Sequence, residues 1–277
     1  MSLQGTTHHS CSPAWLVRSL WRNRSLTLQL IRREVIGRYR GSVMGLLWSF
    51  LHPVLMLAVY TFVFSVVFKA RWGGSSESQA QFALTLFAGL LVFNLFSECV
   101  TRSPTLITSN INYVKKVIFP LEILPVVALG SAAFHFFVSL CVWLLFYVAF
   151  HGLPPSTFLL VPLAALPLFV MTLGCAWFLS ALGVYLRDVT QVVAVVMPVL
   201  MFMSPVFYPL SALPDGIRGV VSAVPLNVII EEFRNAMIWG HGIDWPAWGA
   251  VTAGCVLVAL LGFAWFQKTR RGFADVL

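Results

Sequence analysis

The stretch Val43–Phe68 constrains the fold more than any other part of the chain. It is apolar, and His52 is its only residue that can take up a proton near neutral pH. A hydrocarbon core about 30 Å thick is crossed by a helix of roughly 20 apolar residues, and this stretch is long enough. A strand or coil would leave its peptide groups without hydrogen-bond partners in lipid. We therefore expect the chain to enter a membrane near its N-terminus.

Further apolar runs of similar length follow. Only 10% of the residues are charged, whereas soluble domains carry about 25%. The spans leave no room for a sizeable soluble domain. The sequence therefore predicts an all-α membrane protein with six transmembrane helices, at Val43–Phe68, Phe82–Val100, Ile123–Phe150, Phe158–Leu186, Val192–Leu210 and Trp248–Phe266.

Two shorter apolar segments, Ile217–Val224 and Val228–Trp239, separate the fifth and sixth spans. Neither is long enough to cross a membrane. Asn227 is a candidate N-cap for the second segment, and Gly240 can end it. We expect two short re-entrant helices that dip into the membrane and return.

A segment with seven arginines precedes the first span. Its apolar residues recur at helical spacing, at Leu28, Ile31, Val35 and Tyr39. Arg33 and Arg40 lie opposite, so the segment predicts an N-terminal amphipathic interface helix on the membrane surface. Two interpretations stay open: the helix only orients the protein, or it also receives a cytosolic partner or an anionic headgroup. The predicted divisions are a cytoplasmic N-terminal segment (1–41), the transmembrane domain (42–267) and a cytoplasmic tail (268–277).

The basic residues also predict the orientation. With a cytoplasmic N-terminus, the outer segments hold only Lys69, Arg71, Arg218 and Arg234 of the 18 lysines and arginines. The positive-inside rule then places both termini in the cytoplasm. The net charge of +8 is thereby assigned to membrane orientation, and no nucleic-acid partner is expected.

Few ionisable groups lie in the predicted spans. Glu98 lies four residues before Arg102, and an ion pair between them at the membrane interface is favoured over a proton relay. His135 has no second ligand at helical spacing, so a packed or hydrogen-bonded core histidine is expected. The five cysteines form no C-x-x-C pair; buried thiols are favoured over a metal site or a disulfide.

Sequence motifs for catalysis are missing. The chain has no G-x-x-x-x-G-K-[ST] loop for ATP, no H-E-x-x-H and no G-x-S-x-G. No carboxylate pair lies in a span, which disfavours a membrane-embedded glycan-modifying enzyme. A secondary transporter would need coupling groups near the membrane midplane. A transport subunit driven by another protein fits best, and its many aromatic rings could stack on sugars.

Six motifs, taken together, resemble a known family. The sequence is similar to the membrane subunits of ABC-2 type exporters, in the branch that exports polysaccharides and polyol phosphates and includes O-antigen, capsule and teichoic-acid permeases. The matching residues are Arg38-Tyr39-Arg40-Gly41-Ser42 with Leu46-Leu47-Trp48 and Pro53, Asn110 with Lys115-Lys116-Val117-Ile118-Phe119-Pro120, Glu122-Ile123-Leu124-Pro125, Tyr185-Leu186-Arg187-Asp188-Val189, Ser204-Pro205-Val206-Phe207-Tyr208 and Phe273-Ala274-Asp275-Val276.

The resemblance implies an assembly and a substrate. The chain would form a homodimer bound to two copies of a cytosolic ABC ATPase, which would bind ATP and Mg, so this chain is not expected to be an enzyme. The complex would carry a lipid-linked, O-antigen-like polysaccharide across the bacterial inner membrane. Teichoic acid, capsule or a small hydrophobic compound are the alternative substrates.

The resemblance also suggests three sets of site residues. An entrance for the lipid diphosphate, which also follows from the need for cationic donors at the interface, would use Arg33, Arg38, Tyr39 and Arg40. These arginines could instead simply anchor the helix to the membrane surface. Docking of the ATPase would involve Leu28, Ile31, Arg32, Val35, Asn110, Tyr113, Lys115, Lys116 and Phe119. The outer gate would contain Pro225, Asn227, Glu231, Phe233 and Arg234.

Overall fold

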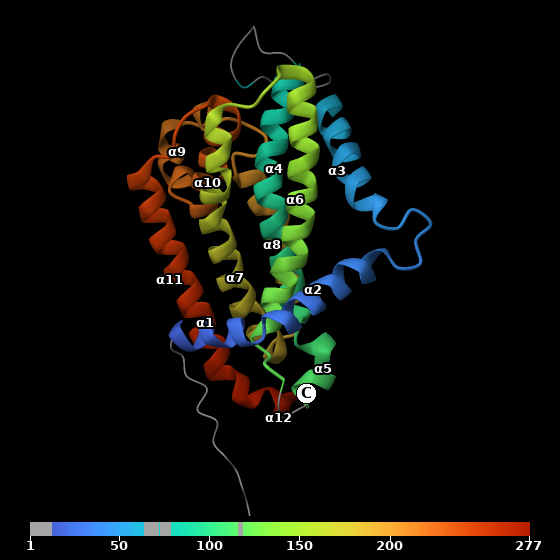
Figure 1. Cartoon of the computed structure of the whole chain (residues 1–277). Coiled ribbons are helices and arrows are strands. Elements are labelled where there is room, and N and C mark those ends of the chain that lie inside the picture. Colours follow the sequence, from blue (N-terminus) through green and yellow to red (C-terminus); the bar gives the residue numbers. More distant parts are fainter. Residues whose placement is uncertain (1–12, 64–71, 73–78, 116–118) are drawn as a thin grey trace, which may run out of the picture.

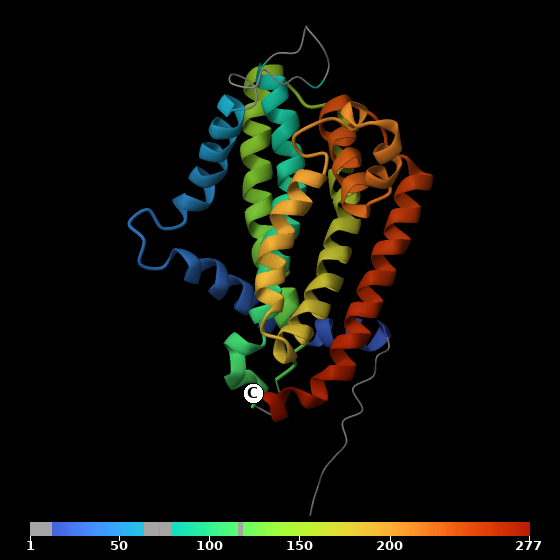
Figure 2. The same cartoon turned by 180° about the vertical axis from the view of Figure 1, so that it is seen from behind.

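The computed structural model describes residues 13–63, 72, 79–115 and 119–277, and every regular element among them is helical. Long helices run side by side, two helices cross one end of this bundle, and two short helices cap the other (Figures 1 and 2). The long helices are α4 (Gln79–Arg102), α6 (Ile123–His151), α7 (Val161–Tyr185) and α11 (Trp245–Thr269). The short elements near the crossed end are α5 (Ile111–Val114) and α12 (Phe273–Val276).

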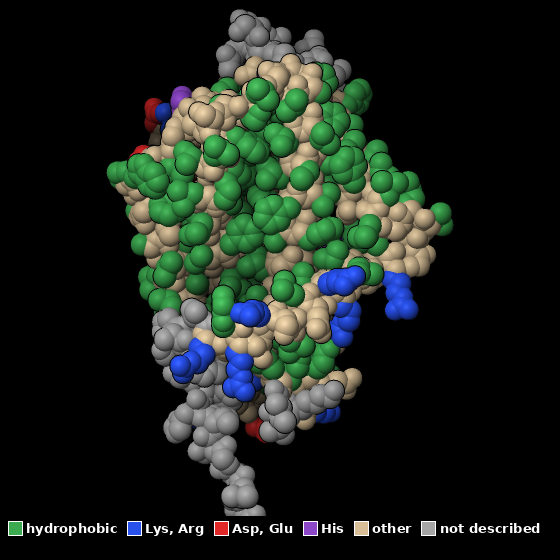
Figure 3. All heavy atoms as spheres, viewed as in Figure 1, with side chains coloured by type: hydrophobic (Ala, Val, Ile, Leu, Met, Phe, Trp, Pro, Cys, Tyr) green, Lys and Arg blue, Asp and Glu red, His purple; other side chains and the backbone are tan. Residues whose placement is uncertain are grey.

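Among the described residues, four helical stretches are long and apolar enough to cross a membrane: Ala80–Thr105, Ile123–His151, Ser156–Tyr185 and Trp245–Val276. They contain the predicted second, third and sixth spans, and the predicted fourth span except its last residue, Leu186. On the face shown in Figure 3, hydrophobic side chains cover much of the bundle between its two ends, while lysines and arginines gather along the crossed end. The prediction of an α-helical membrane protein is confirmed at this level.

The helix of the first predicted span begins later than predicted. Helix α3 (Leu47–Tyr60) begins after Gly45 rather than at Val43. Gly41 and Gly45 have φ values of 85° and 50°, and such left-handed residues interrupt a right-handed helix. The helical stretch continues to Val63, and the predicted end at Phe68 lies outside the described residues.

The predicted bounds of the fifth span, Val192–Leu210, are wrong. Helix α8 covers Val189–Met203, a length of 15 residues, or about 22 Å at 1.5 Å per residue. Ser204 is extended (φ −85°, ψ 149°), because Pro205 disfavours a helical conformation in the residue before it. Helix α8 therefore stops short of the length that a simple span needs.

Two short helices occupy the segment where the sequence predicts them. They are α9 (Asp215–Ser222) and α10 (Pro225–Arg234), and a π-helical turn, Asn235–Trp239, extends the second. Gly240 ends this turn with a φ of 68°, as predicted. The prediction that Asn227 is the N-cap is wrong: Val224 occupies that position, and the Asn227 amide donates to the Val221 carbonyl at 2.8 Å.

The basic N-terminal segment forms two helices instead of one, α1 (Pro13–Arg22) and α2 (Arg24–Tyr39). They meet at Asn23, whose side-chain amide donates to the Ser19 carbonyl at 2.8 Å. Helix α2 packs across α6 (Figure 1). The predicted apolar face is partly wrong, because Leu28 is 65% exposed while Leu30 is buried against Ile123 and Val127.

Helices α7 and α11 pack closely through small residues. A Cβ atom added to Gly174 would lie 2.6 Å from the Ala259 Cα, and one added to Gly262 would lie 2.2 Å from the Gly174 carbonyl oxygen. Small residues allow such close approach between membrane helices. This contact lies on one side of the bundle. The other side consists of α2, α3, α4 and α6, and polar groups converge there.

Candidate functional site at the interface of α2, α4 and α6

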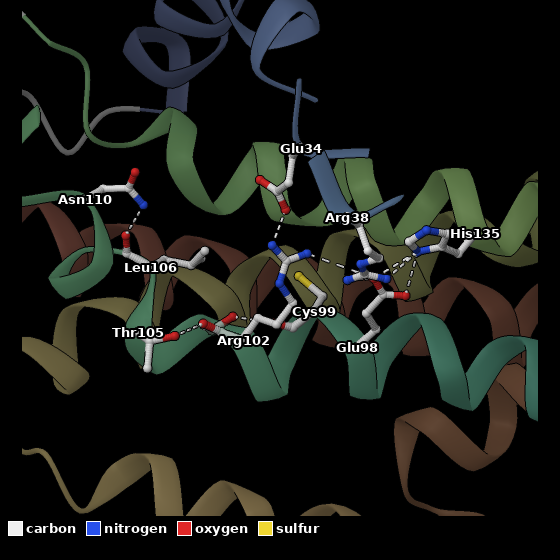
Figure 4. Close-up of polar contacts among 10 residues, drawn as sticks. Glu34, Arg38, Glu98, Cys99, Arg102, Thr105, Leu106, Asn110 and His135 are labelled. Carbon is white, nitrogen blue, oxygen red and sulfur yellow. Dashed lines mark hydrogen bonds and ion pairs between the residues drawn. The ribbon is translucent and has the colours of Figure 1, made fainter. Parts of the chain in front are cut away.

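A network of charged side chains joins α2 to α4 (Figure 4). Arg38 Nη2 lies 2.7 Å from Glu98 Oε1, and Arg102 donates to the Glu34 carboxylate. The predicted pair between Glu98 and Arg102 is present, but at 4.0 Å it is the longest of these contacts. The principal partner of Glu98 is therefore a residue of α2, which the sequence did not indicate.

His135 of α6 completes the network. Its Nδ1 atom lies 3.0 Å from both Glu98 carboxylate oxygens and from Arg38 Nη1, and its Nε2 atom lies 3.0 Å from the Tyr39 hydroxyl. The expectation of a hydrogen-bonded histidine is confirmed. One nitrogen cannot both donate to Glu98 and accept from Arg38, so the position of the ring proton decides which contact is a hydrogen bond.

The Glu98 carboxylate favours one of these arrangements, because an ionised carboxylate only accepts hydrogen bonds. A proton on Nδ1 lets this atom donate to Glu98, and the Tyr39 hydroxyl can then donate to Nε2. In this arrangement Glu98 accepts from both Arg38 and His135, and the charges of Glu34, Arg38, Glu98 and Arg102 balance.

The network forms one end of a cavity of about 570 Å³ between α2, α3, α4 and α6. Apolar side chains, including those of Phe87, Leu90 and Leu91, line part of it. The polar lining residues are Arg38, Tyr39, Ser49, His52, Asn94, Ser97, Glu98, His135 and Ser139. Ionisable side chains among membrane helices typically mark a substrate or ion pathway, and the volume is that of a ligand site.

The structure separates the predicted entrance residues into two groups. Arg38 and Tyr39 line the cavity. Arg33 instead lies on another side of α2, where its Nη2 donates to the Tyr113 hydroxyl at 2.9 Å. Arg40 is exposed just after α2 ends. Only the first two therefore share a site with Glu98 and His135.

Only some of the predicted docking residues lie together in a cluster. Tyr113 stacks on Phe119, with ring centroids 4.2 Å apart and 6° between the planes, and Arg33 joins them through Tyr113. Lys115 is exposed nearby; Lys116 lies outside the described residues.

The remaining predicted docking residues are placed differently. Leu28 and Arg32 are exposed, whereas Val35 is buried and Ile31 packs against Leu30, Ile123 and Val127. The Asn110 amide donates to the Leu106 carbonyl at 2.8 Å (Figure 4). Ile31 thus holds α2 on α6, and the exposed residues are the accessible part of this set.

Arg234 dominates the predicted outer-gate residues. Its side chain is fully buried and donates to the carbonyls of Thr85 (3.1 Å), Pro205 (2.5 Å) and Val206 (2.9 Å). It also contacts Glu231 at 3.1 Å and lies 4.3 Å from the centre of the Trp72 ring. This one side chain ties α10 to α4 and to the segment after α8. Phe233 and Asn227 are also buried, while Pro225 is exposed.

A second buried charge holds the crossed end together. Glu122, 1% exposed, accepts from Arg270 Nη1 at 2.6 Å and from the Ser19 hydroxyl at 2.7 Å. Arg270 Nη2 also donates to the Phe119 carbonyl at 3.1 Å. The contact joins α1, the start of α6 and the end of α11.

Sequence reasoning missed Glu34, Trp72, Thr85 and Arg270 as partners, and it did not join Glu98 or His135 to Arg38. The available signal was the rarity of ionisable groups in apolar helices, which draws attention to Glu98 and His135. Their pairing depends on how helices far apart in the sequence align. Among the described residues, no group of three or more His, Cys, Asp or Glu could hold a metal ion.

The pattern of one family, the ABC-2 type transporters, matches residues 25–238. The chain is 30% identical to the O-antigen export system permease protein RfbA of Myxococcus xanthus, over 94% of this chain and 98% of that protein. A protein of the same name from Klebsiella pneumoniae is 24% identical over 91% and 95% of the two chains. The polysialic acid transport protein KpsM of Escherichia coli is 23% identical over 82% and 86%.

The family match and these similarities agree with the apolar helices. They also agree with the resemblance that the motifs indicate. The chain belongs to the ABC-2 type transporter family.

Proposed function

We propose that this chain is the membrane permease subunit of an ATP-driven exporter that carries a lipid-linked, O-antigen-like polysaccharide across the bacterial inner membrane. The observation that carries the proposal is the 30% identity over 98% of the length of an O-antigen export permease. The polar cavity beside α2 supports it, because a phosphate arriving from the inner leaflet needs cationic donors at the membrane interface.

The proposed assembly has six spans per chain, with α3 and α8 as the two shorter ones, α9 and α10 as re-entrant helices, and both termini in the cytoplasm. Two copies of the chain would bind two copies of a cytosolic ATPase, which supplies the ATP and Mg chemistry. The lysines and arginines gathered at the crossed end (Figure 3) fit the cytoplasmic side by the positive-inside rule.

The docking surface for the ATPase is proposed at the cluster of Arg33, Tyr113 and Phe119 with the exposed Lys115. The Lys115→Glu variant is expected to lower the ATPase activity stimulated by the permease, because it places a negative charge where the partner meets a positive one. ATP hydrolysis by the reconstituted complex measures this. Arg187→Glu, at an exposed position between α7 and α8, is the matched charge reversal. Equal losses of ATPase activity in both variants would contradict docking at this particular surface.

A small hydrophobic compound is the second candidate substrate. A largely apolar cavity of about 640 Å³ between α4, α7, α8 and α11 favours it, with Phe96, Phe178 and Trp265 in its lining. Such a lining suits an apolar ligand, although it also suits lipid chains.

Deletion of the gene separates the two candidates. The polysaccharide proposal expects lipid-linked glycan to accumulate inside the cell and surface glycan to disappear, with both restored by the intact gene. Unchanged surface glycan together with altered sensitivity to apolar drugs would instead favour the small-compound exporter. Co-purification tests the assembly: a chain that transports without an ATPase would contradict it.

A further inference from the structure

Glu98 lies between two guanidinium groups and contacts only one of them closely. Its Oε1 atom is 2.7 Å from Arg38 Nη2 and 4.0 Å from Arg102 Nη1. Nη2 of Arg102 is occupied by Glu34, whereas Nη1 is buried and donates no hydrogen bond to the residues that the structure describes (Figure 4). A buried donor is thus oriented toward Glu98 without being satisfied by it.

This geometry gives the Glu98 carboxylate a second position in which it could accept hydrogen bonds. An unsatisfied buried donor is unfavourable, and a charge-assisted hydrogen bond has a length of about 2.8 Å. A shift of Glu98 by about 1 Å would therefore satisfy Nη1 of Arg102. If the whole carboxylate turns away with this shift, Arg38 Nη2 and the Nδ1 proton of His135, which is now 3.0 Å from both Glu98 oxygens, lose their acceptor. Both freed donors line the 570 Å³ cavity.

The lining of the cavity suits a lipid with a phosphate head. Arg38 and His135 lie at its polar end, while Phe87, Leu90, Leu91 and Met56 line an apolar part. A phosphate would take two charge-assisted hydrogen bonds from the polar end, and its hydrocarbon chain would contact the apolar residues. Without an incoming anion, Glu98 occupies the donors that the phosphate would use.

We propose that Glu98 is a displaceable internal anion: the phosphate of a lipid in this cavity binds Arg38 and His135, and Glu98 moves from Arg38 to Nη1 of Arg102. The inference rests on the proposed function for the arrival of such a lipid. Its consequence is local, because the tie between Arg38 at the end of α2 and Glu98 on α4 opens, while the Glu34–Arg102 contact remains. Arrival of the lipid would thereby loosen the end of the interface helix.

Binding of farnesyl diphosphate to the full-length protein in lipid nanodiscs tests the proposal, with farnesol as the phosphate-free control. Glu98→Gln removes the competing charge and is expected to tighten diphosphate binding about tenfold, whereas Arg38→Gln weakens it by a similar factor. Arg24→Gln, on the same helix but outside the cavity, should leave binding unchanged. Weaker or unchanged binding by the Glu98→Gln protein would overturn the displacement.

A double-mutant cycle separates displacement from simple charge attraction. If Glu98 moves onto Arg102, then Arg102→Gln weakens diphosphate binding in the wild-type background and has little effect when Glu98 is already glutamine. Equal weakening in both backgrounds would show that Arg102 acts only through its charge and would refute the exchange. Thermal unfolding of each variant checks that the binding differences come from folded protein.

A second ligand tests which class of lipid supplies the phosphate. Phosphatidylglycerol replaces farnesyl diphosphate in the same assay: tightening of only the diphosphate in Glu98→Gln identifies an isoprenoid diphosphate, and equal tightening of both identifies a general phospholipid headgroup. Tightening of neither contradicts the proposal. Because no glycan is exported in this assay, its failure would leave the export experiment standing, and failure of export would leave the binding result intact.

Discussion

The two ends of the molecule both depend on arginines, but their main acceptors differ. At the end capped by α9 and α10, Arg234 is fully buried and donates to three backbone carbonyls and one carboxylate, that of Glu231. At the end crossed by α2, Arg38 and Arg102 are 38% and 31% exposed and pair with the carboxylates of Glu98 and Glu34.

The acceptors explain what each end can do. Backbone carbonyls are fixed by the segments that carry them, so the three around Arg234 hold it in a single arrangement. Carboxylates lie on rotatable side chains and can change partners at low cost. The α9–α10 end is therefore built to keep one geometry, and the α2 end has alternatives within about 1 Å.

Replacement of Arg234 should give the largest effect and tests the rigid end. In Arg234→Lys the charge remains, but a single ammonium group cannot reach all three carbonyls or stack on Trp72 as a planar group. We expect a loss of about 3–5 kcal/mol in the free energy of unfolding, measured by unfolding of the purified protein in detergent micelles.

Arg218→Lys is the control for this prediction. Arg218 of α9 also donates to carbonyls, those of Leu210, Ser211 and Leu213, but its side chain is 43% exposed. Water can replace these bonds, so a loss below about 1 kcal/mol is expected. Equal losses in the two variants would break the comparison, because burial of the arginine would then not matter.

Glu122→Gln sharpens the comparison, because it alters a buried charge at the otherwise adjustable end. The substitution leaves Arg270 without its anion and weakens the bond from Ser19. We expect the free energy of unfolding to fall by about 3 kcal/mol, measured in the same unfolding experiment. A loss as small as that of an exposed pair would show that the whole α2 end, its buried part included, adapts to lost contacts.

The sequence predicts most of the helices because their signals are local. Apolar runs mark α4, α6, α7 and α11, and Gly240 marks the end of the π-helical turn. The predicted helix bounds are wrong where the backbone conformation of a single residue determines the helix end, as at Gly45 and Ser204. Similarly, the predicted apolar face of α2 is wrong at Leu28, because packing on α6 turns a different side of the helix inward.

The candidate site is predicted less completely, and for a different reason. Arg38 and Tyr39 belong to a motif that can be read along the chain, so both are found from the sequence. Glu98 and His135 are 37 residues apart and meet only because α4 and α6 align in one register, which no local pattern encodes. The sequence indicates Arg234 only as an outer-gate residue, and nothing in its local pattern shows that the fold buries it completely.

Glu34→Gln gives the smallest expected effect and tests whether the α2 end is adjustable. The Glu34 and Arg102 side chains are 25% and 31% exposed, so losing their pair should cost about 1 kcal/mol or less. Glu98 is already 4.0 Å from Arg102 and can compensate by moving closer. The difference from wild type should shrink further between 0.1 M and 1 M salt, since the Debye length falls from about 10 Å to about 3 Å. A loss comparable to that of Glu122→Gln, unchanged by salt, would mean that Glu98 cannot take over the vacated arginine and that both ends of the molecule are equally fixed.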